Sequence, residues 1–333
     1  MDLNIYYCQE NEAIVENVQH EEKHLINNVL SLFDGMSCGQ IALERAGIKY
    51  NNYYASEIKK DAIAVTQDNY PNTIQLGDIN KIDFSKLPKI DLLIGGSPCQ
   101  DFSRANMERK GIDGDKSNLF NKYKEAFEIL KPKYFILENV IMDDFGYEYI
   151  SSSLETYPVR INSSLVSAQL RDRLYWTNIG NCYYDLLGYR FCDIPQPKDK
   201  KIMLKDILDS GYTDRLKSRA LLVSDSRPLK NQVRMLHRYI ETGMTTIVFS
   251  KKDILNLFKN KRQGWNEYKS NNEKIELPNN SIRYFSQLEM EKLQTVPTGY
   301  TEILTRNKAA GLLGDGWTVD VISHIFSFIK DSR

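Results

Sequence analysis

One cysteine lies where nucleophilic chemistry is possible. Cys99 is part of the run Gly95-Gly96-Ser97-Pro98-Cys99-Gln100-Asp101-Phe102-Ser103, directly after the apolar residues 90–94. The thiolate is the nucleophilic form of cysteine, and a positive or polar environment favours it. Cys99 is therefore a candidate nucleophile, although a lone cysteine after a buried strand is more often a core residue.

A carboxylate and two arginines end or follow other predicted strands. Glu138, in Leu137-Glu138-Asn139-Val140, could protonate or hydrogen-bond a substrate. In residues 169–176, alternation along a strand places Gln169, Arg171 and Arg173 on one face. Two guanidinium groups on one face suit an anion or a substrate carbonyl. Taken singly, Glu138 would more often be a helix cap or a salt-bridge partner, and the arginines fit a solvated strand face as well as a binding face.

Three more loops together predict a site for an adenosine-type cofactor. Residues 33–39, Phe33-Asp34-Gly35-Met36-Ser37-Cys38-Gly39, lie between a strand and a helix, where glycines allow a tight turn and helix N–H groups are free. Glu57 ends the second strand and could bind ribose hydroxyls. Asp78 ends the third and could accept a hydrogen bond from an adenine amine. The chain has no G-x-x-x-x-G-K run, which disfavours ATP.

The elements that must position these loops alternate along the chain. Apolar runs predict strands at 29–33, 53–57, 90–94 and 133–137, and helical spacing predicts helices at 40–46 and 119–130. This alternation predicts an α/β fold, a parallel sheet with helices on both faces. Ligands of such sheets bind at the carboxyl ends of the strands, so the loops above should meet at one edge.

The composition excludes several classes of protein. Of the 333 residues, 41% are hydrophobic and 11% aromatic, which is enough for a large core and argues against intrinsic disorder. No run approaches the roughly 20 apolar residues that span a bilayer, so no membrane partner is expected. The polar N-terminus is unlike a signal peptide. Five cysteines without a C-x-x-C pair predict free thiols, and hence a reducing, cytoplasmic compartment.

Charge is unevenly distributed along the chain. The 44 Lys and Arg residues balance 44 Asp and Glu, but residues 198–274 carry 18 basic against 9 acidic residues. This stretch is either an ordinary solvated surface or a cationic face for phosphates. Four stretches can be distinguished: a polar N-terminal extension at 1–28, the strand–helix region at 29–180, a less periodic region at 181–280, and an orderly segment at 281–333.

Taken together, these motifs resemble those of the C5-cytosine DNA methyltransferases. The S-P-C-Q, E-N-V and Q-x-R-x-R signatures occur in the order of that family. Residues 283–297 are similar to its ninth motif, and Gly314-Asp315-Gly316-Trp317-Thr318-Val319 resembles its tenth. The resemblance runs from about 29 to 330, except over 181–280. The motif wording is most similar to the animal de novo branch, whereas the abundant Asn, Lys, Tyr and Ile suggest a bacterial or phage source.

The resemblance implies a fold and a reaction. The fold would be the Rossmann-like sheet of S-adenosylmethionine-dependent methyltransferases, with a smaller target-recognition domain at 181–280 and a C-terminal segment that returns to the catalytic domain. The reaction would transfer a methyl group from S-adenosyl-L-methionine to C5 of a cytosine flipped out of double-stranded DNA, through a covalent bond from Cys99 to C6. Glu138 would hold N3 and the exocyclic amine, while Arg173, with Arg171, would hold O2.

The resemblance also implies the residues that bind cofactor and DNA. The cofactor site would comprise Phe33, Asp34, Gly35, Met36, Ser37, Cys38, Gly39, Glu57, Ile58, Asp78, Ile79, Ser97, Pro98, Asp315, Gly316 and Trp317. The DNA contacts would comprise Gln100, Ser103, Arg215, Lys217, Arg219, Arg227, Lys230 and Arg234. Asp315 stands where other members often have Asn or Arg. No metal is expected, and the oligomeric state is left open, with a homodimer as one option.

Alternatives from other classes were weighed. Methylation of cytosine in tRNA, and a catalytically silent DNA-binding homologue, remain open. His20-Glu21-Glu22-Lys23-His24 matches the H-E-x-x-H zinc motif, but it lies in a polar arm without a third ligand, so we reject it. An exocyclic-amine methyltransferase would need an Asp/Asn-Pro-Pro-Tyr loop in place of Ser97-Pro98-Cys99-Gln100.

Overall fold

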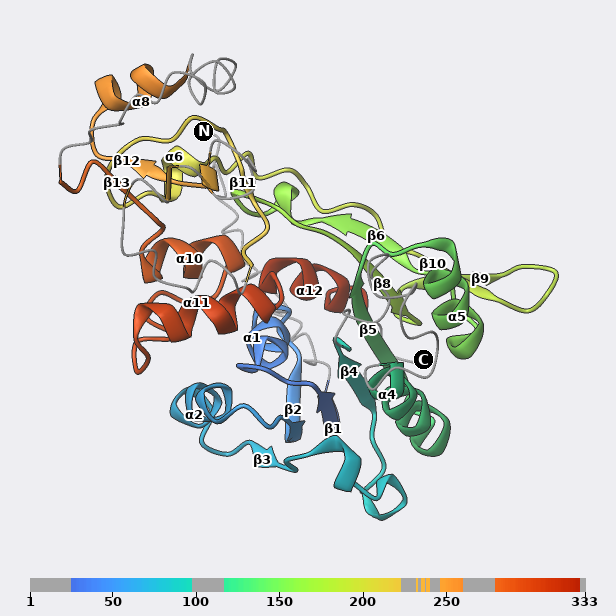
Figure 1. The fold of residues 1–333 in the computed structure, drawn as a ribbon. Coiled ribbons are helices and arrows are strands. Elements are labelled where there is room, and N and C mark those ends of the chain that lie inside the picture. Colours follow the sequence, from blue (N-terminus) through green and yellow to red (C-terminus); the bar gives the residue numbers. More distant parts are fainter. Residues whose placement is uncertain are drawn as a thin grey trace, which may run out of the picture.

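A computed structural model shows the arrangement of the elements (Figure 1). It describes residues 25–97, 117–222, 232, 235–236, 238–239, 246–259 and 279–329. The strands are β1 (Leu25–Leu32), β2 (Lys49–Ser56), β3 (Ile74–Gln75), β4 (Leu92–Gly95), β5 (Tyr134–Val140), β6 (Val159–Asn162), β7 (Gln169–Leu170), β8 (Asp172–Thr177), β9 (Asn181–Tyr184), β10 (Arg190–Asp193), β11 (Ser218–Arg219), β12 (Val248–Phe249) and β13 (Ile282–Arg283). The helices are α1 (Cys38–Arg45), α2 (Lys60–Asn69), α4 (Ser117–Leu130), α5 (Asp144–Leu154), α6 (Leu204–Ile207), α8 (Lys252–Lys259), α10 (Gln287–Gln294), α11 (Arg306–Asp315) and α12 (Val319–Phe326). None of these helices combines the length and the apolar character needed to cross a membrane.

The central sheet confirms the predicted α/β fold. Its seven strands follow the order β3-β2-β1-β4-β5-β8-β6. The pairs from β3 to β5 are parallel, whereas β8 runs antiparallel to both β5 and β6. The expectation of a wholly parallel sheet is therefore wrong at this edge. The connection from β6 to β8 contains no crossover helix, which a parallel pair would need, so β8 enters the sheet in the opposite direction.

Helices cover both faces of the sheet, and each face has its own hydrophobic core. On one face, α4 and α5 pack against strand residues such as Leu30, Leu93 and Leu137. On the other, α1, α10, α11 and α12 pack against Val29 and Ile94, among others. Side chains alternate between faces along a strand, and both faces are buried, which explains why β1 and β4 read as continuous apolar runs.

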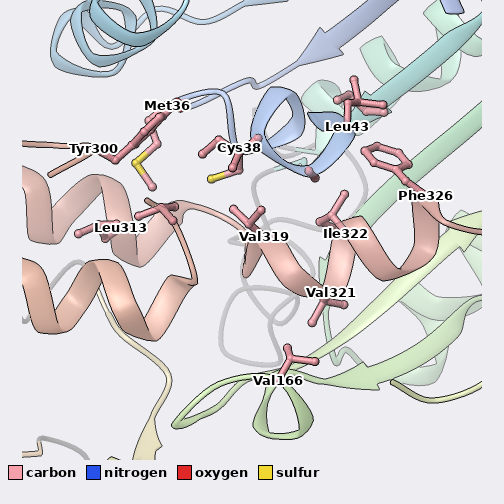
Figure 2. Close-up of a cluster of buried hydrophobic side chains, with 14 of the residues drawn as sticks. Met36, Cys38, Leu43, Val166, Tyr300, Leu313, Val319, Val321, Ile322 and Phe326 are labelled. Atoms are coloured by element: carbon pink, nitrogen blue, oxygen red, sulfur yellow. Dashed lines mark hydrogen bonds between the residues drawn. The ribbon is translucent and has the colours of Figure 1, made fainter. Parts of the chain in front are cut away.

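The last helix of the chain packs against the first. Figure 2 shows α12, which carries Val319, Ile322 and Phe326, beside α1, and these side chains share a hydrophobic core with Cys38 and Leu43 of α1. An ion pair between Arg45 and Asp320, at 2.6 Å, adds a polar contact at the start of α12. The C-terminal segment therefore lies directly beside the loop that follows β1.

A smaller hydrophobic cluster forms apart from the sheet. It contains Met235, Leu236, Tyr239, Ile247, Phe249, Leu255 and Ile282, and it surrounds the antiparallel pair of β12 and β13. Most of its members fall within the predicted target-recognition stretch. The exact limits of that domain stay a prediction, and β1 begins at Leu25, inside the stretch that was interpreted as an N-terminal extension.

The expectation of free thiols is wrong for two cysteines. Cys182 of β9 and Cys192 of β10 face each other across an antiparallel hairpin and form a disulfide. Their pairing results from the register of the two strands, which spacing along the sequence does not reveal. Among the described residues, Cys38 is a free cysteine and is buried.

Candidate active site

The loop after β1 has an unusual backbone that fixes it to the next strand. Phe33, Gly35 and Ser37 all adopt left-handed conformations, with φ of 59°, 61° and 59°. Such a conformation costs a non-glycine residue energy, so it persists only where the surroundings hold it. Here the N–H of Asp34 donates to the carbonyl of Ser56 at 3.1 Å, and that of Gly35 to Glu57 Oε2 at 2.9 Å.

The carboxylate of Asp34 holds this loop from within. It accepts hydrogen bonds from Ser37 Oγ at 2.5 Å and from the Tyr53 hydroxyl at 2.8 Å. Burial raises the pKa of Asp34 to about 6, against the opposing effect of these hydrogen bonds. Its contacts are those of a group that shapes the loop after β1 from inside.

Two further predicted carboxylates lie at the ends of neighbouring strands. Glu57 Oε1 accepts from the N–H groups of Ile58 and Lys59, both at 2.8 Å, just before α2 begins. Asp78 lies beyond the short strand β3, and its Oδ1 accepts from the N–H of Asn80 at 3.0 Å. Because β2 and β3 are parallel, the two carboxylates stand at the same edge.

The loop after β1 also contacts the C-terminal segment closely. The Tyr300 hydroxyl donates to the carbonyl of Met36 at 2.7 Å. A Cβ atom built on Gly316 would lie 3.1 Å from Met36 Cε and 3.4 Å from Cys38 Sγ, so the two loops touch. Burial raises the pKa of the Cys38 thiol to about 12, which keeps it protonated and unreactive.

Glu138, Arg173 and Trp317 come together at this edge, from three separate stretches of the sequence. Arg173 Nε lies 2.8 Å from Glu138 Oε1, and the indole Nε1 of Trp317 donates to Glu138 Oε2 at 3.2 Å. The side chains of Glu138 and Arg173 are only 11% and 15% exposed. Glu138 lies within β5, opposite Tyr175 of β8, so the sheet itself sets its position.

The residue after Glu138 fixes the start of the cysteine loop. Asn139 is buried, and its side-chain amide donates to Ser97 Oγ at 3.1 Å. Ser97 is buried and follows β4. Pro98, Cys99, Gln100 and Ser103 lie outside the described residues, as do Arg227, Lys230 and Arg234.

Arg171 binds the C-terminal segment. Its guanidinium donates to the carbonyls of Gly314 and Gly316 at 3.1 and 2.9 Å. Burial lowers the pKa of Arg171 to about 10. Arg171 lies between β7 and β8, and its side chain reaches these backbone carbonyls; its contact with a substrate carbonyl stays a prediction.

The candidate DNA contacts have different surroundings. Lys217 Nζ donates to the carbonyls of Ser164 and Ser167 at 2.6 and 2.9 Å, and burial lowers its pKa. Arg215 pairs with Asp214 at 3.0 Å. These two cations are therefore engaged inside the protein, whereas Arg219 on β11 is exposed.

Some residues of the site were missed by sequence reasoning. Lys59 forms an ion pair with Asp315 at 2.6 Å and so joins the loop after β2 to the C-terminal segment. Gln294 is fully buried, accepts from the Thr318 hydroxyl at 3.0 Å, and donates to the carbonyl of Leu313. A polar residue within the apolar face of a helix was the available signal for Gln294. Nothing in the sequence indicated the pairing of Lys59.

The fold is that of solved methyltransferase structures. The structure of an Entamoeba histolytica methyltransferase, EhMeth, matches with a TM-score of 0.66 at 16% identity, over 91% of this chain and 97% of that one. The S. pombe Dnmt2 methyltransferase matches with a TM-score of 0.60 at 16% identity, over 91% and 97%. At this level of identity, the likeness is one of fold.

The family is defined by the sequence match. Residues 27–331 match the model of the C-5 cytosine-specific DNA methylases, and the chain belongs to this family. It is 37% identical over 160 residues to the orphan methyltransferase M.SPRI of Bacillus phage SPR, which is 44% of this chain and 36% of that protein. It is 38% identical over 204 residues to the type II methyltransferase M.NgoBV of Neisseria gonorrhoeae, covering 55% and 46%. The matches thus span less than half of these relatives.

Proposed function

We propose that this protein methylates C5 of cytosine in double-stranded DNA, with S-adenosyl-L-methionine as the methyl donor. The observation that carries the proposal is the buried Glu138, held between Arg173 and Trp317 at the sheet edge where the strand-end carboxylates also stand. A carboxylate and a guanidinium in contact supply the acceptor and the donors that the edge of a cytosine ring requires. Family membership supports the same reaction.

The residues at this edge suit the proposed cofactor. A Cβ built on Gly35 or Gly77 would meet no described atom within 4 Å, so open space adjoins the loops after β1 and β3. Glu57 stands between them and keeps a lone pair on Oε2 for a ribose hydroxyl, and Asp78 would accept from an adenine amine. Ile58 offers an apolar side chain that is 69% exposed. The cofactor supplies a methyl group on a sulfonium, which is a strong electrophile.

Cytosine C5 is a poor nucleophile, so the protein must activate it. The Cys99 thiolate would form a bond to C6 and push electron density to N3 and C5, while Glu138 donates a proton to N3 and accepts from the exocyclic amine, and Arg173 donates to O2. Once C5 is methylated, water takes the C5 proton, the electrons of that C–H bond form the C5–C6 double bond, the Cys99 thiolate leaves C6, and the N3 proton returns to Glu138. Cys99 follows the anchored Ser97 by two residues, so the covalent chain keeps the two Cα atoms within about 8 Å.

Duplex DNA is the proposed partner, and the flipped cytosine must leave the base stack to reach Glu138. We place the enzyme in the cytoplasm, of a bacterium or of a phage-infected cell. This placement depends on the substrate, because the disulfide between Cys182 and Cys192 removes the support that free thiols would have given. Exposed Arg219 is the described residue that we propose for a DNA contact.

Bisulfite sequencing tests the proposal. DNA from cells that lack cytosine methylation is sequenced after expression of the full chain, of Cys99→Ser, and of Glu138→Gln. A matched control is Glu128→Gln, an exposed carboxylate on α4. We expect protected cytosines with the native chain and the control, none with Cys99→Ser, and only a small residual fraction with Glu138→Gln. Unprotected DNA with well-folded native protein, or methyl transfer to tRNA alone, would contradict the proposal.

A further inference from the structure

We propose that Trp317 is a positioning residue for Glu138, and that it couples the cofactor site to the base site. The inference rests on the proposed role of Glu138 toward cytosine. The indole N–H and the Arg173 guanidinium each bind a different oxygen of the Glu138 carboxylate. The carboxylate is therefore held from both sides, and its rotation is restricted.

This arrangement leaves the carboxylate able to bind a base. The two oxygens of a carboxyl group have about four hydrogen-bonding sites, one of which is an O–H donor when the group is protonated. Arg173 uses one on Oε1, at 2.8 Å, and Trp317 uses one on Oε2, at 3.2 Å. Each oxygen thus keeps a site for the base, and the two donors fix the direction in which those sites face. A phenylalanine at 317 would fill similar space but could not donate.

A glycine beside the pair lets the indole and the carboxylate meet. A Cβ built on Gly96 would lie 2.9 Å from Trp317 Nε1 and 3.1 Å from Glu138 Oε2. Both values are shorter than ordinary van der Waals contacts, so a side chain at this position would displace one of the two groups. Gly96 immediately precedes Ser97, which Asn139 anchors. The contact is thus built into the loop that leads to Cys99.

The backbone that carries Trp317 is attached to the cofactor side. Arg171 holds the carbonyls of Gly314 and Gly316, and Gly316 packs against Met36 of the loop after β1. The neighbouring Asp315 pairs with Lys59. A cofactor that orders this segment would also order the indole, and therefore Glu138. Such coupling is reciprocal: each ligand should strengthen the binding of the other by the same factor.

Trp317→Phe tests the inference, on a duplex that contains the site mapped by bisulfite sequencing. A hydrogen bond to a charged group is typically worth enough to change a rate by about tenfold or more when it is lost. We expect the single-turnover rate at saturating cofactor to fall about tenfold, with the melting temperature unchanged. We also expect the cofactor to strengthen DNA binding less in the variant than in the native enzyme.

A double-mutant cycle separates positioning from a structural effect. If Trp317 acts through Glu138, adding Trp317→Phe to Glu138→Gln should leave the residual single-turnover rate unchanged. A further tenfold loss in that background would overturn the inference. If Trp317→Phe lowers the melting temperature, Gly96→Ala replaces it in the same cycle, since it separates the same two groups without removing the indole from the chain.

The outcomes distinguish this inference from the proposed function. Full activity of Trp317→Phe together with an inactive Glu138→Gln overturns the positioning role and leaves the proposed function intact. Full activity of Glu138→Gln overturns the proposed role of Glu138 itself. Loss in both single variants without further loss in the double variant supports both.

Discussion

Replacing Arg171 should reveal whether this arginine acts on the substrate or on the protein. Arg171→Met removes two hydrogen bonds, at 3.1 and 2.9 Å, and leaves the carbonyls of Gly314 and Gly316 without their donor. Hydrogen bonds of a charged donor contribute about 1.5–3 kcal/mol each. Burial disfavours the charged form of Arg171, so removing that charge offsets part of this loss. We expect a net loss of about 2–4 kcal/mol in the free energy of unfolding.

Urea unfolding at constant m-value measures that loss. Arg171→Lys keeps the charge but can satisfy fewer carbonyls, so it should fall between the native chain and Arg171→Met. The matched control is Arg160→Met. The side chain of Arg160 is 64% exposed in its ion pair with Asp172, so its loss should cost less than about 1 kcal/mol. Cofactor affinity, measured by calorimetry, should fall for Arg171→Met and stay unchanged for the control.

One pattern of results would refute this reasoning. Suppose that Arg171→Met unfolds at the same urea concentration as the native chain and binds the cofactor normally, and yet loses methyl transfer. Arg171 then acts on the substrate. That result would support the expectation that Arg171 holds a substrate carbonyl. It would also show that the contacts to Gly314 and Gly316 contribute little to stability.

Three further changes follow from contacts elsewhere in the site. The pKa of Asp34 in the folded protein is about 6, above its ordinary 3.8. Its contribution to the free energy of unfolding is therefore fully present below pH 3.8 and is lost as the pH rises through 6. Asp34→Asn should remove about 2 kcal/mol of that pH dependence between pH 4 and 7, and an unchanged slope in urea unfolding would contradict this. Gly39→Ala, whose Cβ would lie 2.5 Å from an Ile94 methyl, should cost about 1–3 kcal/mol. At Gly311 the added Cβ meets open space, so Gly311→Ala should not lower the free energy of unfolding. Equal losses for Gly39→Ala and Gly311→Ala would count against the packing argument. Asp315→Asn breaks a half-exposed pair and should change the unfolding free energy by less than about 1 kcal/mol, where a larger loss would be unexpected.

The sequence predicted the part of the site that depends on strand ends. Glu57 and Asp78 follow from the alternation of strands and helices, because parallel strands bring their carboxyl ends to one edge. Glu138 and Arg173 lie at that edge too, although Glu138 is inside β5 and Arg173 comes from an antiparallel strand. Motif order located these two residues, and the backbone pattern alone would not have paired them.

The rest depends on contacts between distant segments, which a periodic pattern does not contain. Alternation assumes a continuous strand, but Arg171 lies between the end of β7 and the start of β8. Its guanidinium binds the carbonyl of Gly316 in the C-terminal segment. Counting charges cannot tell that Lys217 binds two carbonyls inside the protein. Likewise, the disulfide of Cys182 and Cys192 depends on strand register.

Covalent trapping tests the central claim most directly. DNA with 5-fluorocytosine at the mapped target is incubated with the full chain and S-adenosyl-L-methionine. Release of the cysteine requires loss of the proton on C5, and a fluorine in its place cannot be removed in this way, so the bond to C6 cannot break. We predict a protein–DNA complex that survives denaturing electrophoresis for the native chain and is absent for Cys99→Ser. An active native enzyme that forms no such complex, or a complex that persists in Cys99→Ser, would contradict attack by Cys99.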